Sequence, residues 1–190
     1  INGVDVLTTN NDKYTQKTSG YKQYNFMQKL AYKTKSGFTH SANFQYSTST
    51  NINRYDRLTD KSSIGLKSAE WYYGPQKRVL VVYSLEKENV FLNTDFKLDA
   101  GYQNVEESRH NRNFGNYNLQ SRIEKVAVYS LAANFETKLK KGNLYYGIEN
   151  YYDDLKSIAE KTNIKTGIVV PLDTRYPNGE NNMMRNDVYL

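Results

Sequence analysis

The sequence predicts an all-β chain whose antiparallel strands follow one another in an up-and-down sheet. Apolar and polar residues alternate along several segments, short and long connections alternate between these segments, and tyrosine is unusually frequent. Of the 190 residues, 18 are tyrosine, although only 38% are hydrophobic. A disordered chain would be poor in aromatic residues, and a soluble core would use leucine, isoleucine and valine before tyrosine. Tyrosine, with an apolar ring and a polar hydroxyl, suits a surface between two media.

The alternation is clearest between residues 92 and 103. Phe96 and Leu98 fall in one phase of this segment, and Asp95 and Lys97 fall in the other. Successive side chains of a strand point to opposite faces, so one face is apolar and the other polar. The same period predicts about six strands, with one further short strand at each end: 22–33, 38–47, 77–86, 91–103, 122–137, 143–153, 4–8 and 188–190.

The six strands show this pattern with different clarity. The second, fourth and fifth alternate throughout, whereas Gln28 interrupts the apolar row of the first and the sixth alternates weakly. The third is apolar in both phases between Val79 and Leu85, so the sequence does not say which of its faces meets which medium.

The connections between the strands alternate in length. Three are short and polar or glycine-bearing, as hairpin turns are: 34–37, 87–89 and 140–143. Three are long: 48–76, 104–121 and 154–187. Every long connection therefore lies at one end of the sheet, as in outer-membrane barrels with short periplasmic turns and long external loops. The strands also suit the about 9–11 residues of a tilted membrane strand, so we expect the wall of a transmembrane β-barrel.

Aromatic residues gather near the ends of two strands, which is typical of the interfacial girdles of such barrels. Trp71, Tyr72 and Tyr73 precede the third strand, and Tyr151 and Tyr152 close the sixth. Ordinary aromatic packing at a sheet end is the alternative. Six to eight strands is at or below the roughly eight of the smallest bacterial barrels, and an open sheet in lipid would leave backbone groups unpaired. We therefore expect a partial barrel, a fragment of a larger one.

Charge and composition argue against several other classes. The net charge is +6, but the basic residues are scattered and no nucleic-acid-binding motif occurs, so no nucleic-acid partner is expected. These cations could instead meet the phosphates of lipopolysaccharide or an anionic ligand. No apolar run has the length of a membrane helix, and the first residues do not resemble a signal peptide. Two histidines and no cysteine predict no metal site and no cofactor.

No catalytic centre is recognisable, so we do not expect an enzyme. The adjacent carboxylates Glu106 and Glu107 would point to opposite faces of a strand, and no nucleophile or phosphate-loop motif occurs. The acidic pair at 153–154 lacks the spacing of a calcium loop. In the first long connection Arg54 and Arg57 could clamp an anion, but a loop-stabilising pair with the aspartate between them is the favoured interpretation.

Five stretches carry information beyond periodicity: 53–58 (NRYDRL), 69–78 (AEWYYGPQKR), 102–112 (YQNVEESRHNR), 145–149 (YYGIE) and 175–179 (RYPNG). Together they resemble TonB-dependent outer-membrane receptors, in particular those of Bacteroidetes-type bacteria. The resemblance implies that residues 1–190 are part of a receptor barrel of roughly 22 strands whose plug domain is absent from this chain. Such receptors sit in the cell outer membrane and import a scarce nutrient, such as a ferric siderophore or haem.

The resemblance also implies partners and a place for the ligand. The partners are outer-membrane lipid and lipopolysaccharide, the TonB complex through the plug region, a small-molecule or haem-type ligand and, possible but without a supporting residue, a surface lipoprotein. Ligand-binding residues are expected in the long loops 104–121 and 154–187, which converge above the opening. The candidates are Arg109, His110, Arg112, Arg175 and Tyr176. An imidazole could ligate haem iron, although one histidine without a partner is weak evidence.

Two other functions remain open. The first is a porin-like or structural outer-membrane barrel, which lacks a plug. The second is a soluble β-sandwich that binds carbohydrate through its tyrosines, and it predicts a contiguous apolar core. The barrel predicts instead that Phe44, Leu98, Leu131 and Phe135 face lipid.

Overall fold

The structure, a computed structural model, describes residues 4–63, 65–174, 176–177 and 179–190. Seven long strands dominate it: β1 (Gln23–Lys33), β2 (Thr39–Ser49), β7 (Lys77–Phe91), β8 (Thr94–Asn113), β9 (Asn118–Leu139), β10 (Gly142–Asn163) and β12 (Gly179–Tyr189). The short elements are β3 (Ile52–Asn53), α1 (Tyr55–Leu58), β4 (Lys61–Ser62), β5 (Gly65–Leu66), β6 (Ser68–Tyr73) and β11 (Val169–Pro171).

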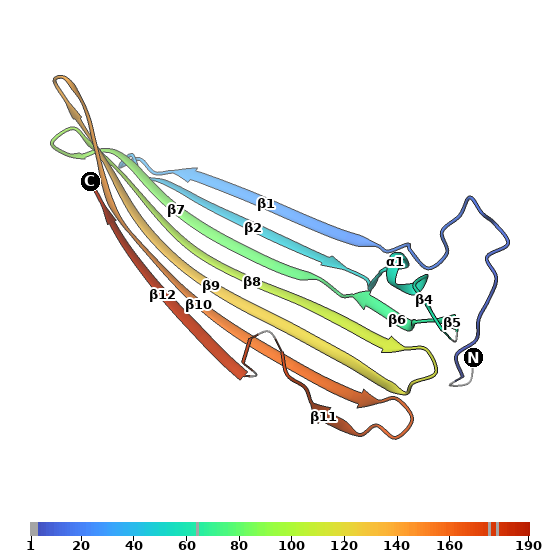
Figure 1. Cartoon of the computed structure of the whole chain (residues 1–190). Helices are drawn as coiled ribbons and strands as arrows, with labels where there is room; N and C mark the ends of the chain where they lie inside the picture. The colour runs from blue at the N-terminus through green and yellow to red at the C-terminus, as the bar shows by residue number, and fades with distance from the viewer. Residues whose placement is uncertain (1–3, 64, 175, 178) are drawn as a thin grey trace.

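Ten of these strands form one antiparallel sheet in the order β1-β2-β7-β8-β9-β10, so each long strand lies beside the next along the chain (Figure 1). Both β11 and β12 pair with the free side of β10, and β6 pairs with the part of β8 that extends beyond β7. The all-β class and the antiparallel up-and-down order are confirmed. The sheet is not closed, because β1 and β12 do not pair with each other in the described sheet.

The expected long loops at 104–121 and 154–187 are wrong for most of their length. β8 continues to Asn113 and β9 starts at Asn118, so only 114–117 connect them. In the same way β10 continues to Asn163, and β11 and β12 occupy much of the stretch that follows. In these segments apolar residues no longer alternate with polar ones. The strands still pair, because the backbone hydrogen bonds between strands do not require an apolar face. No strand forms at residues 4–8.

The strand pairing brings the apolar phases of neighbouring strands onto one face. Across the middle of the sheet, Leu98 lies opposite both Leu85 and Ala133, and Ala133 lies opposite Ile148. Directly opposed residues of an antiparallel pair point to the same side, so these apolar residues share a face. The other face is mainly polar, although Leu80 and other apolar residues of the central strands also lie there. The two phases of the sequence thus become two chemically different faces.

The apolar face is the convex one. In β2 the apolar-phase residues Ala42, Phe44 and Tyr46 are exposed, whereas the polar residues between them are half-buried. On the same face of β9 and β10, Leu131 and Ile148 are exposed, whereas Ser130 and Glu149 of the polar phase, on the other face, are half-buried. On the polar face, the sheet forms a hollow of about 530 Å³ near the short hairpin turns, lined mostly by polar and charged side chains from β1 to β12. A face on which side chains from so many strands converge is concave, and the strands are visibly bowed (Figure 1).

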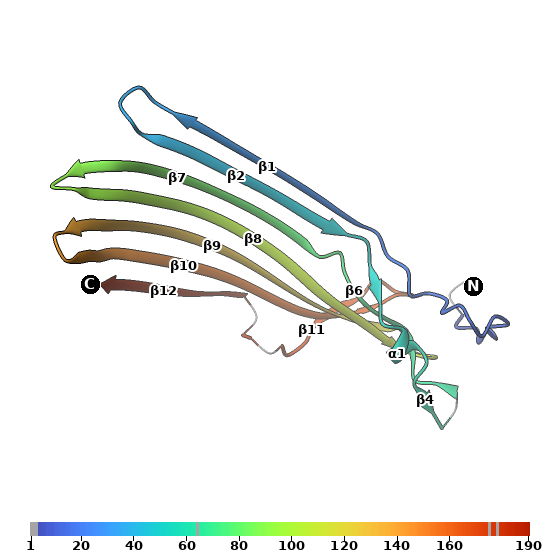
Figure 2. The same ribbon diagram turned by 90° about the horizontal axis from the view of Figure 1, so that it is seen from above.

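The sheet is a single layer, as the view from above shows (Figure 2). Among the described residues Ala159 is the one buried hydrophobic side chain. The accessible surface is 13352 Å², against roughly 9,300 Å² expected for a folded globular chain of this mass. Large apolar side chains such as Leu131 and Ile148 remain about half exposed. The sheet therefore has no core of its own, and its apolar face is not covered by any described residue.

Candidate functional site

The convex face carries a band of apolar side chains bounded by two aromatic rows. The row farther from the hairpin turns consists of Tyr102, Tyr129 and Tyr152, with ring centroids 5.1 and 6.2 Å apart. The row nearer the turns consists of Phe96, Phe135 and Tyr146, with ring centroids 5.2 Å apart in both pairs. We call the band between and including these rows the apolar belt.

The height of the apolar belt follows from the register. On each of β8, β9 and β10 the two aromatic rows are six residues apart, since the pairs are 96 and 102, 135 and 129, and 146 and 152. At about 3.4 Å per residue the rows are about 20 Å apart along the strands. Between them lie mostly aliphatic side chains, including Leu98, Leu131 and Ile148. At the tilt of about 35–45° that strands have in membrane barrels, this separation gives a height of about 15 Å, which is the larger part of the apolar band of about 25 Å.

The aromatic residues expected to form a girdle are divided between the two faces. Tyr152 belongs to the row farther from the hairpin turns, which we call the upper row of the apolar belt; the row nearer the turns is the lower row. Tyr151 lies on the concave face, where the guanidinium carbon of Arg185 is 4.3 Å from its ring centroid. Trp71 and Tyr73 also lie on the concave face, opposite Asn111 and Arg109 and well beyond the belt. Tyr72, between them, lies on the convex face opposite His110.

Beyond the upper aromatic row, β8, β9 and β10 continue as a segment that is largely polar on both faces, joined at its side by β6. We call this part of the sheet, residues 68–73, 104–126 and 154–163, the polar extension. Its convex face presents Glu106, Ser108, His110 and Arg112 along β8, and its concave face presents Arg109 and other polar residues. A strand that is polar on both faces suits water on both sides.

Arg112 is the most completely bound cation in the polar extension. Its side chain is 7% exposed, and its guanidinium donates to both carboxylate oxygens of Asp5 at 2.9 and 2.8 Å. It also donates to Glu70 Oε1 and to the carbonyl oxygen of Asn116, each at 2.7 Å. The hydrogen bonds that Asp5 accepts from Arg112 lower the pKa of Asp5. Arg112 thus holds the N-terminal segment on the tip of the β8–β9 hairpin, and its ligand-binding role stays a prediction.

His110 lies next to this cluster in a tightly bonded setting. Its ring stacks on Tyr72 with centroids 4.7 Å apart. Nδ1 is 2.9 Å from the hydroxyl of Ser121, and Nε2 is 3.0 Å from the hydroxyl of Ser108, which donates to the carbonyl oxygen of Gly74. Burial lowers the pKa of His110. With both ring nitrogens hydrogen-bonded, this arrangement leaves no nitrogen free to ligate haem iron.

Arg109 has a different environment, although it is adjacent in sequence to His110. It projects from the concave face and lies directly opposite Arg122 of β9. In the described part of the chain it forms no ion pair or side-chain hydrogen bond. Of the other two candidates, Arg175 lies outside the described residues, and Tyr176 is 41% exposed in the connection before β12. The structure therefore does not bring the five candidates into one site.

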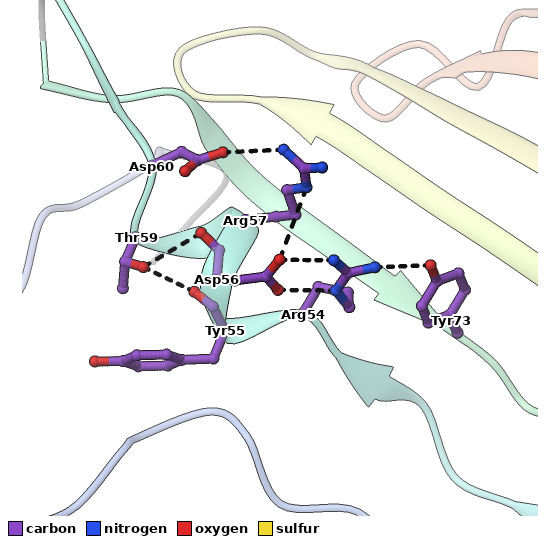
Figure 3. Close-up of polar contacts among 7 residues, drawn as sticks. All are labelled: Arg54, Tyr55, Asp56, Arg57, Thr59, Asp60 and Tyr73. Carbon is purple, nitrogen blue, oxygen red and sulfur yellow. Dashed lines mark hydrogen bonds and ion pairs between the residues drawn. The ribbon is translucent and has the colours of Figure 1, made fainter.

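The arginines of the first long connection form a local clamp around one aspartate (Figure 3). Arg54 donates to both oxygens of Asp56, at 2.8 and 2.6 Å, and to the hydroxyl of Tyr73 at 2.8 Å. The hydrogen bonds from Arg54 lower the pKa of Asp56 to about 2. Arg57 reaches Asp60 at 3.4 Å. The favoured interpretation, an Arg–Asp pair that stabilises the loop, agrees with this geometry.

Neither a metal centre nor a membrane-spanning helix is found in the described residues. No group of three histidine, cysteine or acidic side chains there could hold a metal ion, and none of the helices there is long and apolar enough to cross a membrane. Comparisons of this chain with protein-family models, curated proteins and solved structures found no match. The features of this chain that bear on function are therefore the sequence motifs, the apolar belt and the polar extension.

Sequence reasoning missed two features of this site. One is Arg122, which lies at the start of an expected strand and gives no sign of the arginine opposite it until the register is known. The other is the anchor between Asp5 and Arg112, which are 107 residues apart in the sequence. Alternation identifies faces, but it does not identify partners across strands.

Proposed function

We propose that this chain is part of the wall of an outer-membrane β-barrel, in a receptor of the TonB-dependent type that binds and imports a scarce nutrient. The observation that carries the membrane part is the polarity of the curved sheet, which is apolar on its convex face and mainly polar on its concave face. A soluble sandwich buries its apolar faces between layers. A membrane barrel has the reverse arrangement, with lipid outside and a polar lumen inside.

The apolar belt supports this proposal by its composition and its boundaries. Its two aromatic rows correspond to the two interfaces of the membrane, where aromatic side chains concentrate. The hairpin turns next to the lower row are short, while the polar extension lies beyond the upper row. This asymmetry matches short periplasmic turns and large external structures. The ligand would then meet the polar extension first.

The free edges of the sheet support a larger barrel. One side of β1 and most of one side of β12 have no partner in the described sheet. In lipid such an edge would leave backbone N–H and C=O groups without hydrogen bonds, at several kcal/mol each. Further strands on both sides would satisfy these groups. The receptor type itself rests on the resemblance of the five motifs, and a plug domain in the lumen would separate it from a porin.

Two neighbouring alanines test the membrane placement. Ala133 is on the convex face opposite Leu98, and Ala132 is on the concave face opposite Asp99. These 190 residues contain no cysteine, so Ala133→Cys and Ala132→Cys each create one labelling site in this chain, and any cysteine elsewhere in the full-length protein is first replaced by serine. In the full-length protein reconstituted into vesicles, a fluorophore at position 133 should be quenched strongly by lipids with nitroxide-labelled tails, and one at 132 only weakly. Equal quenching at the two positions would contradict the proposed placement.

The absence of an apolar core speaks against the soluble carbohydrate-binding sandwich. That fold needs two layers with their apolar faces together, whereas the described sheet is one layer with a single buried hydrophobic side chain. The porin-like alternative shares the barrel wall. Uptake by cells would separate it from the receptor, because import through a receptor requires the TonB complex and diffusion through a porin does not.

A further inference from the structure

The concave face of the polar extension gathers three cations, and beside them Glu107 and Glu124 lie opposite each other on the same face. Arg109 lies directly opposite Arg122, and Lys161 lies opposite Gln120, one step further along the same face. In the described part of the chain none of the three forms an ion pair. Like charges placed directly opposite each other destabilise a sheet. Among the described residues neither arginine forms an ion pair with Glu107 or Glu124, so both guanidiniums remain available to an added anion.

A hollow lined by side-chain amides adjoins these cations. It has a volume of about 180 Å³ and is lined by Asn111, Asn113, Asn116, Asn118, Gln120 and Lys161. In the described chain the side-chain amides of Asn111, Asn113 and Asn118 form no hydrogen bond with protein. Asn111 and Asn118 are half-buried. The hydrogen-bonding groups of these amides are therefore available to water or to a polar ligand.

The residue types specify the chemistry of that ligand. A side-chain amide both donates and accepts hydrogen bonds, as a sugar hydroxyl does. A guanidinium binds carboxylate or sulfate groups in bidentate fashion. The row Trp71, Asn111, Gln120 and Lys161 runs across four neighbouring strands, about 15 Å at the usual strand spacing. A row of this length suits an elongated ligand of several units, with an aromatic side chain at one end.

We propose that the concave face of the polar extension binds an acidic oligosaccharide, with Arg109 and Arg122 on its carboxylate or sulfate groups and the amides on its hydroxyls. This site deepens the proposed function, on which it rests, by naming a substrate class. It differs from haem binding, because His110 lies on the opposite face with both ring nitrogens hydrogen-bonded to serines. The acidic group separates it from recognition of neutral glycans.

Calorimetric titration of the full-length protein in detergent tests the site with three probes. These are an oligogalacturonate, a sulfated oligosaccharide and a neutral maltooligosaccharide of matched length. We expect at least one acidic probe to bind ten times or more tighter than the neutral one, and to weaken as salt is raised because surface charges are screened. The acidic probe that binds more tightly shows whether the site prefers carboxylate or sulfate groups. Binding of the neutral probe alone or equally well, or of none, would overturn the proposal.

Variants assign the binding to this face. Arg109→Gln combined with Arg122→Gln should weaken binding of the acidic probe ten times or more, and Asn111→Ala with Asn118→Ala should weaken it several times. The matched control is Arg185→Gln, since Arg185 is also on the concave face but is paired with Asp187 and lies near the apolar belt. Each variant must retain its β-sheet circular dichroism. Equal losses in the control and in the arginine pair would overturn the site.

The vesicle labelling at positions 132 and 133 keeps the two proposals separable. Correct quenching without binding of either acidic probe removes the oligosaccharide site and leaves the barrel wall. Equal quenching at both positions removes the barrel wall, whatever the titrations give.

Discussion

The apolar belt and the polar extension are made by the same three strands, β8, β9 and β10, but with different side chains. In the belt one face is apolar and the other mainly polar, and the large apolar side chains are exposed. In the extension both faces are largely polar, and the buried side chains include Ser108, Arg112, Ser121 and Ser157. Backbone pairing continues unchanged from one region to the other. The same backbone pairing thus carries two faces of different composition in the belt and two faces of similar composition in the extension.

The two regions are consequently stabilised in different ways. The belt has no protein layer against its apolar face, so in the proposed barrel its stability depends on contact with hydrocarbon. The extension is held by contacts within the protein, above all those of Arg112, which joins the N-terminal segment, β6 and the tip of the β8–β9 hairpin. Substitutions that are equivalent in exposure should therefore differ in effect between the regions.

The largest expected difference comes from two equally exposed residues on the convex face. Leu131 in the belt is 48% exposed and Ile158 in the extension is 47% exposed. Leu131→Lys should lower the free energy of unfolding in vesicles by about 2–4 kcal/mol, because a charge near the membrane centre loses its hydration. Ile158→Lys should change it by at most about 1 kcal/mol. Guanidinium titrations measure both, and similar losses would remove the distinction between the regions.

A second substitution tests whether the concave face is the more crowded one. A Cβ at Gly147 would lie 2.6 Å from the carbonyl oxygen of Ala133 and 2.6 Å from the hydroxyl of Tyr189. Gly147→Ala should therefore cost about 1–3 kcal/mol through overpacking. At Gly20 an added Cβ would meet nothing within 4 Å, so Gly20→Ala serves as the control and should be nearly neutral. If the same titration shows no loss for Gly147→Ala, the close approach of β12 to β10 is wrong.

The polar extension can be loosened without disturbing the belt. Arg112→Met removes the hydrogen bonds to Asp5, Glu70 and Asn116, and we expect a local loss of about 1–2 kcal/mol, since the released carboxylates can move into water. Hydrogen exchange of residues 110–118 should become faster while that of the belt stays unchanged. Arg57→Met, which removes an exposed arginine, is the control and should have little effect. Faster exchange throughout the sheet would show that the two regions do not behave independently.

The sequence predicted the belt well and the extension poorly, and the reason is the same in both cases. Between Phe96 and Tyr102 one phase of the strand is apolar and the other is mainly polar, so the two faces differ in composition. Beyond Gln103 the phases become alike, and the segment up to residue 121 was expected to be a loop. Alternation predicts a strand only where its two faces differ in polarity, so it does not predict a strand that is polar on both faces.

The candidate site shows a second limit of the sequence. Three adjacent candidates, Arg109, His110 and Arg112, were expected in one loop. Because the segment is a strand, Arg109 points to the concave face while His110 and Arg112 point to the convex one. The partners that decide their roles, Asp5, Tyr72 and Arg122, lie on other elements. The local sequence identified these three positions as candidates. Only the strand register shows that Arg112 has acidic partners and that Arg109 forms no ion pair with a described residue.

The smallest predicted effect is the pH dependence of the N-terminal segment. Hydrogen bonds from Arg112 lower the pKa of Asp5, below the value of about 3.9 of a free aspartate. A carboxyl with a lowered pKa contributes stability above the unfolded value, and this contribution is lost as the pH falls through the folded value. The segment should thus stay docked at neutral pH and be released below about pH 4. The effect is smaller than that of Arg112→Met, because Glu70 and Asn116 still bind the arginine.

An environment-sensitive dye on Leu7→Cys would follow this release, since Leu7 packs close to Gly65 in the docked segment. The dye signal should change with acidification in the otherwise unaltered protein. In Asp5→Asn the signal should be that of the released segment at every pH, because the amide cannot form the charged pair. Dye signals from the belt should not change over the same pH range. A transition in Asp5→Asn as large as in the parent would mean that another group controls docking, and the polar extension would then owe its order to contacts other than the Asp5–Arg112 pair.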